Sequence, residues 1–216
     1  LSISENNSGQ QSQISTLTTA MFDFDEKEFN KTLSINILQL GMEQTTTQII
    51  FPFLQHVGIL WLGGSIHIAH EHFITNLIKQ RMFVAIDQVN VVPNSDAKKY
   101  LLFLPNGENH ELSLLFASYL LRANGQHVIY LGTSTPLDDL NKIHKIHNPD
   151  FVFCALTNSN AAIPVQVYLN TLSRSWPNTQ IIVTGSQVVK RRDLKIPENC
   201  KVMSDPSGFL DFIVNN

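Results

Sequence analysis

The sequence has little of several features that would indicate a function directly. Only two cysteines, Cys154 and Cys200, occur among 216 residues, which argues against a disulfide framework and a four-thiolate zinc site. Basic side chains are also few, since 15 Lys and Arg stand against 18 Asp and Glu and leave a net charge of -3. Such a chain has no cationic field for a phosphate backbone. We expect a soluble, cytoplasmic protein that does not touch nucleic acid through this chain.

Long apolar runs are missing as well. No stretch approaches the roughly 20 continuous apolar residues of a membrane span, and the first residues lack the charged-then-apolar order of a signal peptide. The sequence begins with Leu1 rather than Met, so we expect a piece of a longer protein. With 43% hydrophobic residues, it has enough apolar material for one large or two small cores.

The first part of the chain has a helical pattern. Residues 1–18 are rich in Ser, Gln, Asn and Thr with almost no periodic hydrophobicity, which predicts a flexible tether. Apolar residues then recur at helical spacing, with a capping box at Asp25, a stop at Gly41 and a kink or break at Pro52. We predict a four-helix bundle over residues 19–89.

The pattern changes after a polar, turn-prone stretch at residues 90–98. Short apolar runs then alternate with helical ones, which indicates a parallel sheet covered on both faces. The strands are expected at 100–104, 127–132, 150–156, 180–185 and 201–204, and the helices at 110–123, 136–146, 161–175, 187–192 and 206–214. We therefore predict a five-stranded flavodoxin-like or Rossmann-like domain over 97–216, and an α plus α/β fold for the whole chain.

His110 follows the first predicted strand at its carboxyl end, where doubly wound folds bind their ligands. A neutral imidazole there can coordinate a metal. Glu108 in the same loop can accept the other ring proton and so fix the tautomer. The alternative is that His110 is a partly exposed residue at the start of a helix. The turn alone does not decide between the two.

The helical half contains a second group of chemically active side chains. Trp61 is followed after nine residues by Glu71 and His72, and Ile68 shares one helix face with that pair. His67 borders this face. Taken alone, the group also fits a solvated polar face, or a zinc or nickel patch that includes His67 and Glu71.

Together, the two groups resemble the cobalamin-binding sensor modules of the CarH/LitR-like photoreceptors, the C-terminal part of MerR-type transcription regulators. Trp61, Glu71 and His72 match the motif of that family's helical bundle, a Trp and a Glu-His pair nine residues apart. Glu108 and His110 match the acidic and ligand positions of its second motif, Asp or Glu, x, His, x, x, Gly. The resemblance implies cobalamin with His110 as lower axial cobalt ligand, and Trp61, Ile68, Glu71 and His72 around the upper axial group.

The sequence departs from the family where the nucleotide tail of cobalamin would lie. Ser113 replaces a Gly, Ala155 replaces the Ser of a segment that ends at Thr157, and Gly185-Ser186 replaces a Gly-Gly pair. A Ser side chain costs room against the ligand, and Ala155 lacks a hydroxyl that could donate a hydrogen bond. We expect cobalamin to bind at these positions in an altered tail pocket.

Leu62 is a further departure, since light-sensing relatives place there the His that ligates cobalt after the upper group is lost. Leucine cannot coordinate a metal. We expect His67 or His72 to become the upper cobalt ligand after photolysis, with bound water as the alternative.

The resemblance implies a light-responsive sensor rather than an enzyme. The expected cofactor is adenosylcobalamin, with methylcobalamin and hydroxocobalamin as alternatives. The expected partners are a second copy of the chain or another regulator, with DNA contacted only by a segment outside this chain. Two alternatives remain open, which are a corrinoid carrier protein of a methyltransferase system and a cofactor-free interaction domain.

Overall fold

A computed structural model describes residues 3–93, 95–159 and 163–215, with side chains from residue 9 onward. Its chain divides into two compact units, Leu1–Ala85 and Ile86–Asn216. The helical unit thus ends a few residues before the expected limit at 89. In the described residues, no helix combines the length and apolar character needed to cross a membrane.

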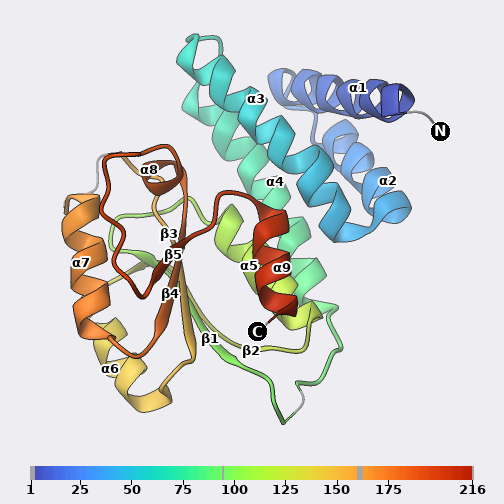
Figure 1. Cartoon of the computed structure of the whole chain (residues 1–216). Helices are drawn as coiled ribbons and strands as arrows, with labels where there is room; N and C mark the ends of the chain where they lie inside the picture. The colour runs from blue at the N-terminus through green and yellow to red at the C-terminus, as the bar shows by residue number, and fades with distance from the viewer. Residues whose placement is uncertain (1–2, 94, 160–162, 216) are drawn as a thin grey trace. The chain divides into compact units, whose positions relative to one another are not determined.

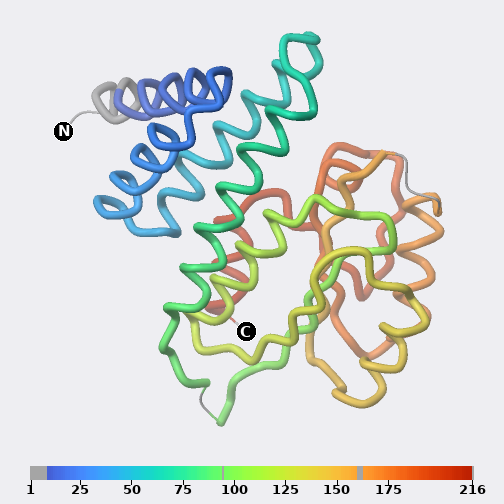
Figure 2. The backbone as a smooth tube through the Cα atoms, turned by 180° about the vertical axis from the view of Figure 1, so that it is seen from behind, coloured from blue at the N-terminus to red at the C-terminus, as the bar shows by residue number. Residues whose placement is uncertain are grey.

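The helical unit consists of α-helices with one π-helical turn. Its elements are α1 (Ile3–Phe22), α2 (Glu26–Thr45), η1 (Thr46–Ile50), α3 (Phe51–Leu62) and α4 (Ile68–Asp87). Helices α3 and α4 run side by side in both views (Figures 1 and 2). The predicted helical bundle is present, but its first α-helix, α1, lies mostly before residue 19, where the predicted bundle begins.

The prediction of a flexible tether over residues 1–18 is wrong, because α1 occupies nearly all of that stretch. Ile14, Leu17 and Met21 are buried, and their three- and four-residue spacing places them on one helix face. The Ser and Thr residues between them are exposed or half-buried. A few apolar residues are therefore enough to hold α1 in the bundle, because the helix packs on its neighbours through this one narrow face.

Two irregularities interrupt the run from α2 to α3. Gly41 has φ 78° and ψ 168°, which breaks the helical geometry at the predicted stop. Pro52 lies in the first turn of α3, where its missing N–H costs no helical hydrogen bond. The π-helical turn η1 immediately precedes it.

Aromatic and aliphatic side chains fill the core of the helical unit. Phe29 from α2 packs against Phe53 from α3 with ring centroids 5.8 Å apart, and both rings are buried. Leu33, Ile74 and Ile78 are also buried. Each such side chain contributes about 1.5–3 kcal/mol by burial.

The second unit is a parallel five-stranded sheet in the order β2-β1-β3-β4-β5. Its strands are β1 (Lys99–Pro105), β2 (His127–Thr135), β3 (Phe151–Ala155), β4 (Gln180–Thr184) and β5 (Cys200–Val202). Its helices are α5 (Leu112–Ala123), α6 (Leu137–His147), α7 (Val165–Ser175), α8 (Ser186–Val189) and α9 (Pro206–Val214). The predicted α/β architecture is confirmed, and the observed strand order is that of a doubly wound fold.

Helices cover both faces of this sheet, as predicted from its apolar strands. Helices α6 and α7 lie on one face and α5 and α9 on the other (Figures 1 and 2). Strand β1 pairs with β2 on one side and with β3 on the other. The connections that leave β1 and β3 therefore diverge, and a doubly wound sheet binds its ligands at that switch point.

Candidate functional site: a histidine and a buried carboxylate at the switch point

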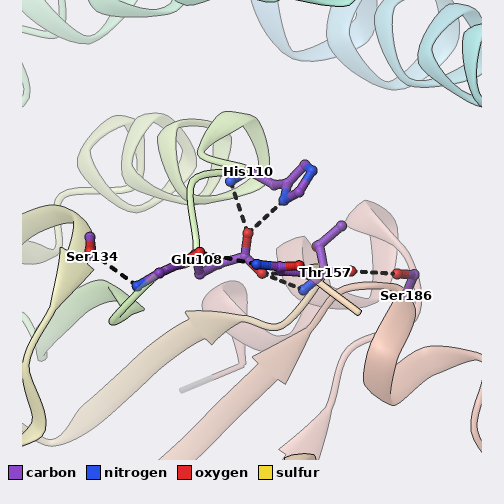
Figure 3. A network of polar contacts seen from close by, with 7 residues as sticks. Glu108, His110, Ser134, Thr157 and Ser186 are labelled. Atoms are coloured by element: carbon purple, nitrogen blue, oxygen red, sulfur yellow. Dashed lines mark hydrogen bonds and ion pairs between the residues drawn. The ribbon is translucent and has the colours of Figure 1, made fainter. Parts of the chain in front are cut away.

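Glu108, in the loop after β1, is 4% exposed and accepts four hydrogen bonds. One carboxylate oxygen, Oε1, accepts from the backbone N–H of His110 at 3.0 Å and contacts its Nδ1 at 2.6 Å. The other, Oε2, accepts from the backbone N–H groups of Thr157 at 2.7 Å and Asn158 at 2.6 Å. Figure 3 shows this carboxylate between the loop after β1 and the turn after β3.

These hydrogen bonds determine the charge of the carboxylate. Burial alone would raise the pKa of Glu108, but hydrogen bonds from the His110 ring and from the N–H groups of Asn158, His110 and Thr157 outweigh it and hold the pKa at about 2. Glu108 is therefore ionised at neutral pH and can only accept. The proton between Glu108 and His110 consequently belongs to Nδ1 of the imidazole.

The predicted contact between Glu108 and His110 is thus present, and it has a chemical consequence. A neutral imidazole with its proton on Nδ1 carries a lone pair on Nε2, which is the atom that a metal binds. The His110 side chain is 51% exposed, and its ring points away from the strands (Figure 3). The alternative of a merely exposed His at a helix start does not explain the buried carboxylate beside it.

The turn after β3 is held in place by the turn after β4. Gly185 has φ 100°, and a Cβ at this position would lie 2.4 Å from the carbonyl oxygen of Leu156. The Ser186 hydroxyl donates to the carbonyl oxygen of Thr157 at 3.3 Å (Figure 3). Gly185 and Ser186 therefore fix the backbone that presents the Thr157 N–H to Glu108.

Three polar residues at the site were not identified from the sequence. The Ser134 hydroxyl, near the carboxyl end of β2, accepts from the Gly107 N–H and donates to Asn106 Oδ1, both at 3.1 Å (Figure 3). Asn158 Nδ2 donates to the Gly107 carbonyl at 3.1 Å. The loop that carries Glu108 is thus tied to β2 on one side and β3 on the other.

The remaining predicted tail-pocket residues lie near this network but outside its hydrogen bonds. Ser113 is half-buried in the first turn of α5, three residues after His110. Ala155 is the last residue of β3 and is completely buried. The structure therefore groups Glu108, His110 and the residues of the two turns, with Ser113 and Ala155 beside them.

A cavity lies at the carboxyl ends of β1, β2 and β3, entirely within the α/β unit. Glu108 forms part of its wall, and most of that wall is apolar. The side chains of Leu137, Leu156, Val165 and Tyr168 form part of that wall. An apolar pocket next to a metal-competent histidine fits a cofactor that combines a metal with a bulky organic tail.

The helical unit presents its predicted residues differently. Trp61, at the end of α3, is 45% exposed, and Ile68 and His72, in the first turns of α4, are also exposed. Glu71 is half-buried. The Thr75 hydroxyl donates to the backbone carbonyls of Glu71 and His72, but the Glu71 carboxylate and the His72 ring have no hydrogen bond to another described residue. These side chains share the region around the α3–α4 connection but form no polar network.

The nearby histidines are engaged with one another. The backbone N–H of His67 donates to Nδ1 of His70 at 3.1 Å, and the two rings stack 5.8 Å apart. His70 in turn stacks on Phe24 at 4.8 Å. Within the described ranges, no three His, Cys, Asp or Glu side chains are placed to hold a metal ion, so the alternative of a zinc or nickel patch with Glu71 finds no support.

Comparisons with known proteins concern the helical unit and the fold. Residues 13–85 match the family model of the B12 binding domain. The whole fold is similar to that of the Methanosarcina barkeri monomethylamine corrinoid protein, with a TM-score of 0.72, 11% identity, and coverage of 95% of this chain and 99% of that one. The matched helical unit indicates a cobalamin-binding domain, and the fold is one that a corrinoid protein shares.

Two curated relatives are transcriptional repressors. The chain is 25% identical over 167 residues to the HTH-type transcriptional repressor CarH of Myxococcus xanthus, covering 77% of this chain and 55% of the relative. It is 26% identical over 146 residues to the repressor CarA of the same organism, covering 68% and 48%. The chain thus spans about half the length of these relatives. The chain is therefore similar to the CarH-like repressors, as the sequence motifs predict.

Proposed function

We propose that this chain is the cobalamin-sensing module of a light-responsive transcription regulator. The observation that carries the proposal is the pair Glu108 and His110, in which an ionised, buried carboxylate holds the imidazole in the tautomer that a metal requires. The similarity to the CarH and CarA repressors supports a regulatory rather than an enzymatic role. DNA recognition would belong to a segment outside this chain or to a partner protein.

In this proposal, His110 binds cobalt from the lower side through Nε2. Glu108 keeps the proton on Nδ1 and increases the basicity of the ring, while Thr157 and Asn158 keep Glu108 ionised. The cavity beside Glu108 receives the nucleotide tail.

The upper side of the cofactor is assigned to the helical unit. We place Trp61, Ile68, Glu71 and His72 around the upper axial group, for which an exposed indole and a half-buried carboxylate are suited. An adenosyl group offers a base for the indole and hydroxyls for the carboxylate, whereas a methyl group offers neither. Adenosylcobalamin is therefore the proposed form of the cofactor, with methylcobalamin and hydroxocobalamin as alternatives.

The signal in this proposal is a loss of contacts. Cobalamin supplies a cobalt–carbon bond that light breaks, and the contacts of Trp61 and Glu71 with the upper group end when that group leaves. A ligand shifts a conformational equilibrium only by its difference in affinity for the two states. Losing the upper group would change that difference and with it the contacts to a second copy of the chain or to another regulator.

A different ligand would have to take the upper position afterwards. Leu62 cannot, and its side chain is exposed. We propose His67 or His72, with water as the competing outcome. His72 is the better placed of the two, because the His67 ring stacks on His70, which is itself packed on Phe24.

The second candidate function is a corrinoid carrier protein of a methyltransferase system. The observation in its favour is the shared fold over 95% of this chain, but a fold at 11% identity does not determine the activity. An apolar lid would suit a methyl group better than the pair Glu71 and His72. This candidate predicts preference for methylcobalamin and no response to light.

One experiment separates the candidates. The purified chain is mixed with adenosylcobalamin or methylcobalamin, and absorption spectra are recorded in the dark and after green light, together with the oligomeric state. We expect tighter binding of adenosylcobalamin, with histidine coordination in the dark and a change of spectrum and assembly in light. Preference for methylcobalamin would favour the carrier, and absence of binding would leave an interaction domain.

A further inference from the structure

The carboxyl end of β2 is irregular where it lies beside the loop that carries His110. Two register shifts interrupt its pairing with β1, one between Tyr130 and Gly132 and one between Gly132 and Thr135, and at each shift β2 holds one residue more than β1. Gly132 has φ 75° and Ser134 has φ 53°, so both lie in the left-handed region. Such β-bulges redirect side chains and are frequent next to functional sites.

This end of β2 holds the part of the loop that precedes His110. The Ser134 hydroxyl accepts from the Gly107 N–H at 3.1 Å. The Ser134 backbone N–H donates to the Glu108 carbonyl at 3.3 Å. Because the bulges bring Ser134 to the loop, the two residues shortly before His110 are tied to β2.

Tyr130, at the first of the two bulges, holds the part of the loop that follows His110. Its hydroxyl donates to Glu111 Oε1 at 2.7 Å, and both side chains are half-buried. Burial and the neighbouring Glu111 raise the pKa of Tyr130 well above its ordinary value, so the phenol keeps its proton and donates it. Glu111 is the N-cap residue of α5, yet its side chain makes no capping hydrogen bond to that helix. Its carboxylate is bonded to β2 instead.

His110 therefore lies between two carboxylates that are bonded to the two strands beside β1. Glu108 accepts from the turn after β3, and Glu111 accepts from Tyr130 on β2. A metal ligand has to be held within about 0.5 Å and 10–20° of its productive geometry, which requires support from groups behind it. Hydrogen bonds to carboxylates are suited to this role, because they are about twice as strong as neutral ones.

We propose that Tyr130 and Glu111 are positioning residues, whose hydrogen bond fixes the start of α5 so that the His110 ring is aimed at the cobalt of a bound corrinoid. This inference rests on the proposed binding of cobalamin through His110 and extends it to two residues that no motif assigns. Neither of them touches the metal. They act through the backbone, because Glu111 directly follows His110 and a fixed Glu111 limits how far that histidine turns.

Four variants separate this role from a contribution to packing. Tyr130→Phe removes the donor and keeps the ring, while Glu111→Ala removes the acceptor and leaves Tyr130 in place. Glu111→Gln keeps a side-chain oxygen that can accept from the phenol. Tyr100→Phe is the matched control, since Tyr100 is completely buried near the start of β1 and its hydroxyl has no partner among the described residues.

Each variant is titrated with hydroxocobalamin, both with His110 present and in the His110→Ala background, and binding is followed by absorbance. We expect Tyr130→Phe and Glu111→Ala to weaken binding by roughly 3- to 10-fold, the fold-change of one net hydrogen bond. Glu111→Gln should retain more affinity than Glu111→Ala, and Tyr100→Phe should match wild type. In the His110→Ala background, Tyr130→Phe should cause no further loss, because no imidazole remains to be aimed.

The spectrum of the saturated complex supplies a second readout. With Tyr130→Phe it should lie between the spectra of wild type and His110→Ala, since part of the bound cobalamin would lack histidine coordination. The melting temperature of each cofactor-free variant is measured beside it. A role in stability alone would lower the melting temperature and leave the saturated spectrum unchanged.

Other outcomes would overturn the proposal while the proposed function stands. These are an unchanged affinity and spectrum in Tyr130→Phe, an equal loss with and without His110, or equal losses in Glu111→Gln and Glu111→Ala. If Tyr130→Phe does not fold, the same comparison is made with Glu111→Ala.

Two results would reach further than this pair. If His110→Ala binds hydroxocobalamin with the affinity and spectrum of wild type, His110 is not the ligand and Tyr130 has nothing to position, although cobalamin binding would stand. A wild type that binds no hydroxocobalamin would overturn the proposed function, and the role of Tyr130 and Glu111 with it.

Discussion

The two units prepare for a ligand in opposite ways. In the α/β unit, Glu108 accepts four hydrogen bonds, and one of them holds His110 in a single tautomer. In the helical unit, Trp61 and His72 are exposed, and the Glu71 carboxylate has no hydrogen bond to another described residue. In the proposed function, the hydrogen-bonded site of the α/β unit would hold the metal throughout. The side chains of the helical unit, which have few hydrogen bonds, would make the contact that is released.

The largest effect is expected from the α/β unit. His110→Ala should abolish histidine coordination of cobalt and weaken cobalamin binding by more than 100-fold, because the metal ligand itself is lost. Glu108→Gln should cost 10- to 100-fold, the usual range for a group that orients a ligand. Visible spectra and titrations measure both. An unchanged spectrum for His110→Ala would contradict the assignment of this ligand.

The next effect concerns the turn that supports Glu108. Gly185→Ala should destabilise the protein by about 3 kcal/mol, because the new Cβ would approach the Leu156 carbonyl within 2.4 Å at a positive φ. Chemical denaturation measures the loss, and cobalamin affinity should fall as well. Gly41→Ala is the control, since it has a similar φ of 78° with no atom within 4 Å, and should cost only about 1 kcal/mol. Equal losses would argue against the close contact.

A smaller and selective effect is expected in the helical unit. Trp61→Ala should weaken adenosylcobalamin binding by roughly 3- to 10-fold and leave methylcobalamin nearly unaffected, because an aromatic contact of about 0.5–1.5 kcal/mol needs a base or sugar to touch. Phe83→Ala removes an aromatic ring of similar exposure, 50% against 45%, and should change neither. If Trp61→Ala lowers the affinity for both cofactors equally, the indole contributes to packing and not to the choice between the two ligands.

The smallest effect is expected for His144, which lies in the α/β unit away from the candidate site. The His144 ring stacks on Trp176 at 4.8 Å and contacts Thr179 Oγ1 at 2.8 Å, and burial lowers the pKa of His144. The unfolded chain therefore takes up this proton more readily, and unfolding free energy should fall as the pH drops below about 6.5. Denaturation at pH 7 and pH 5 should show a weaker pH dependence in His144→Phe, and an equal dependence would exclude His144 as its source.

Much of the α/β unit could be predicted from the sequence, because its signals are local. Strands such as Phe151–Ala155 are uninterrupted apolar runs, and the order of runs and helices determines a doubly wound sheet. The contact between Glu108 and His110 was predictable for the same reason, since only one residue separates them. Helix α1 was missed because Ile14, Leu17 and Met21 are sparse among polar residues, and their value depends on neighbours elsewhere in the bundle.

Other parts of the site could not be predicted from local patterns. Asn158 and Ser134 lie 51 and 27 residues from Gly107, to which both are hydrogen bonded, and ordinary loop residues give no sign of such pairing. Tyr130 is one aromatic residue in a strand, where packing is the usual role. Its hydrogen bond to Glu111, 19 residues away, becomes visible only when the surroundings of each atom are known.

The π-helical turn at Thr46–Ile50 determines which way the end of α3 faces. A π turn accommodates one extra residue compared with an α-helical turn, and each residue of an α-helix advances the chain by 100° around its axis. Deleting a single residue from this turn would let an ordinary helix form there, yet Trp61 would be rotated by about a quarter of a circle. The direction in which the Trp61 indole points thus depends on a turn more than ten residues earlier in the chain, because that turn sets the rotation of α3 about its axis.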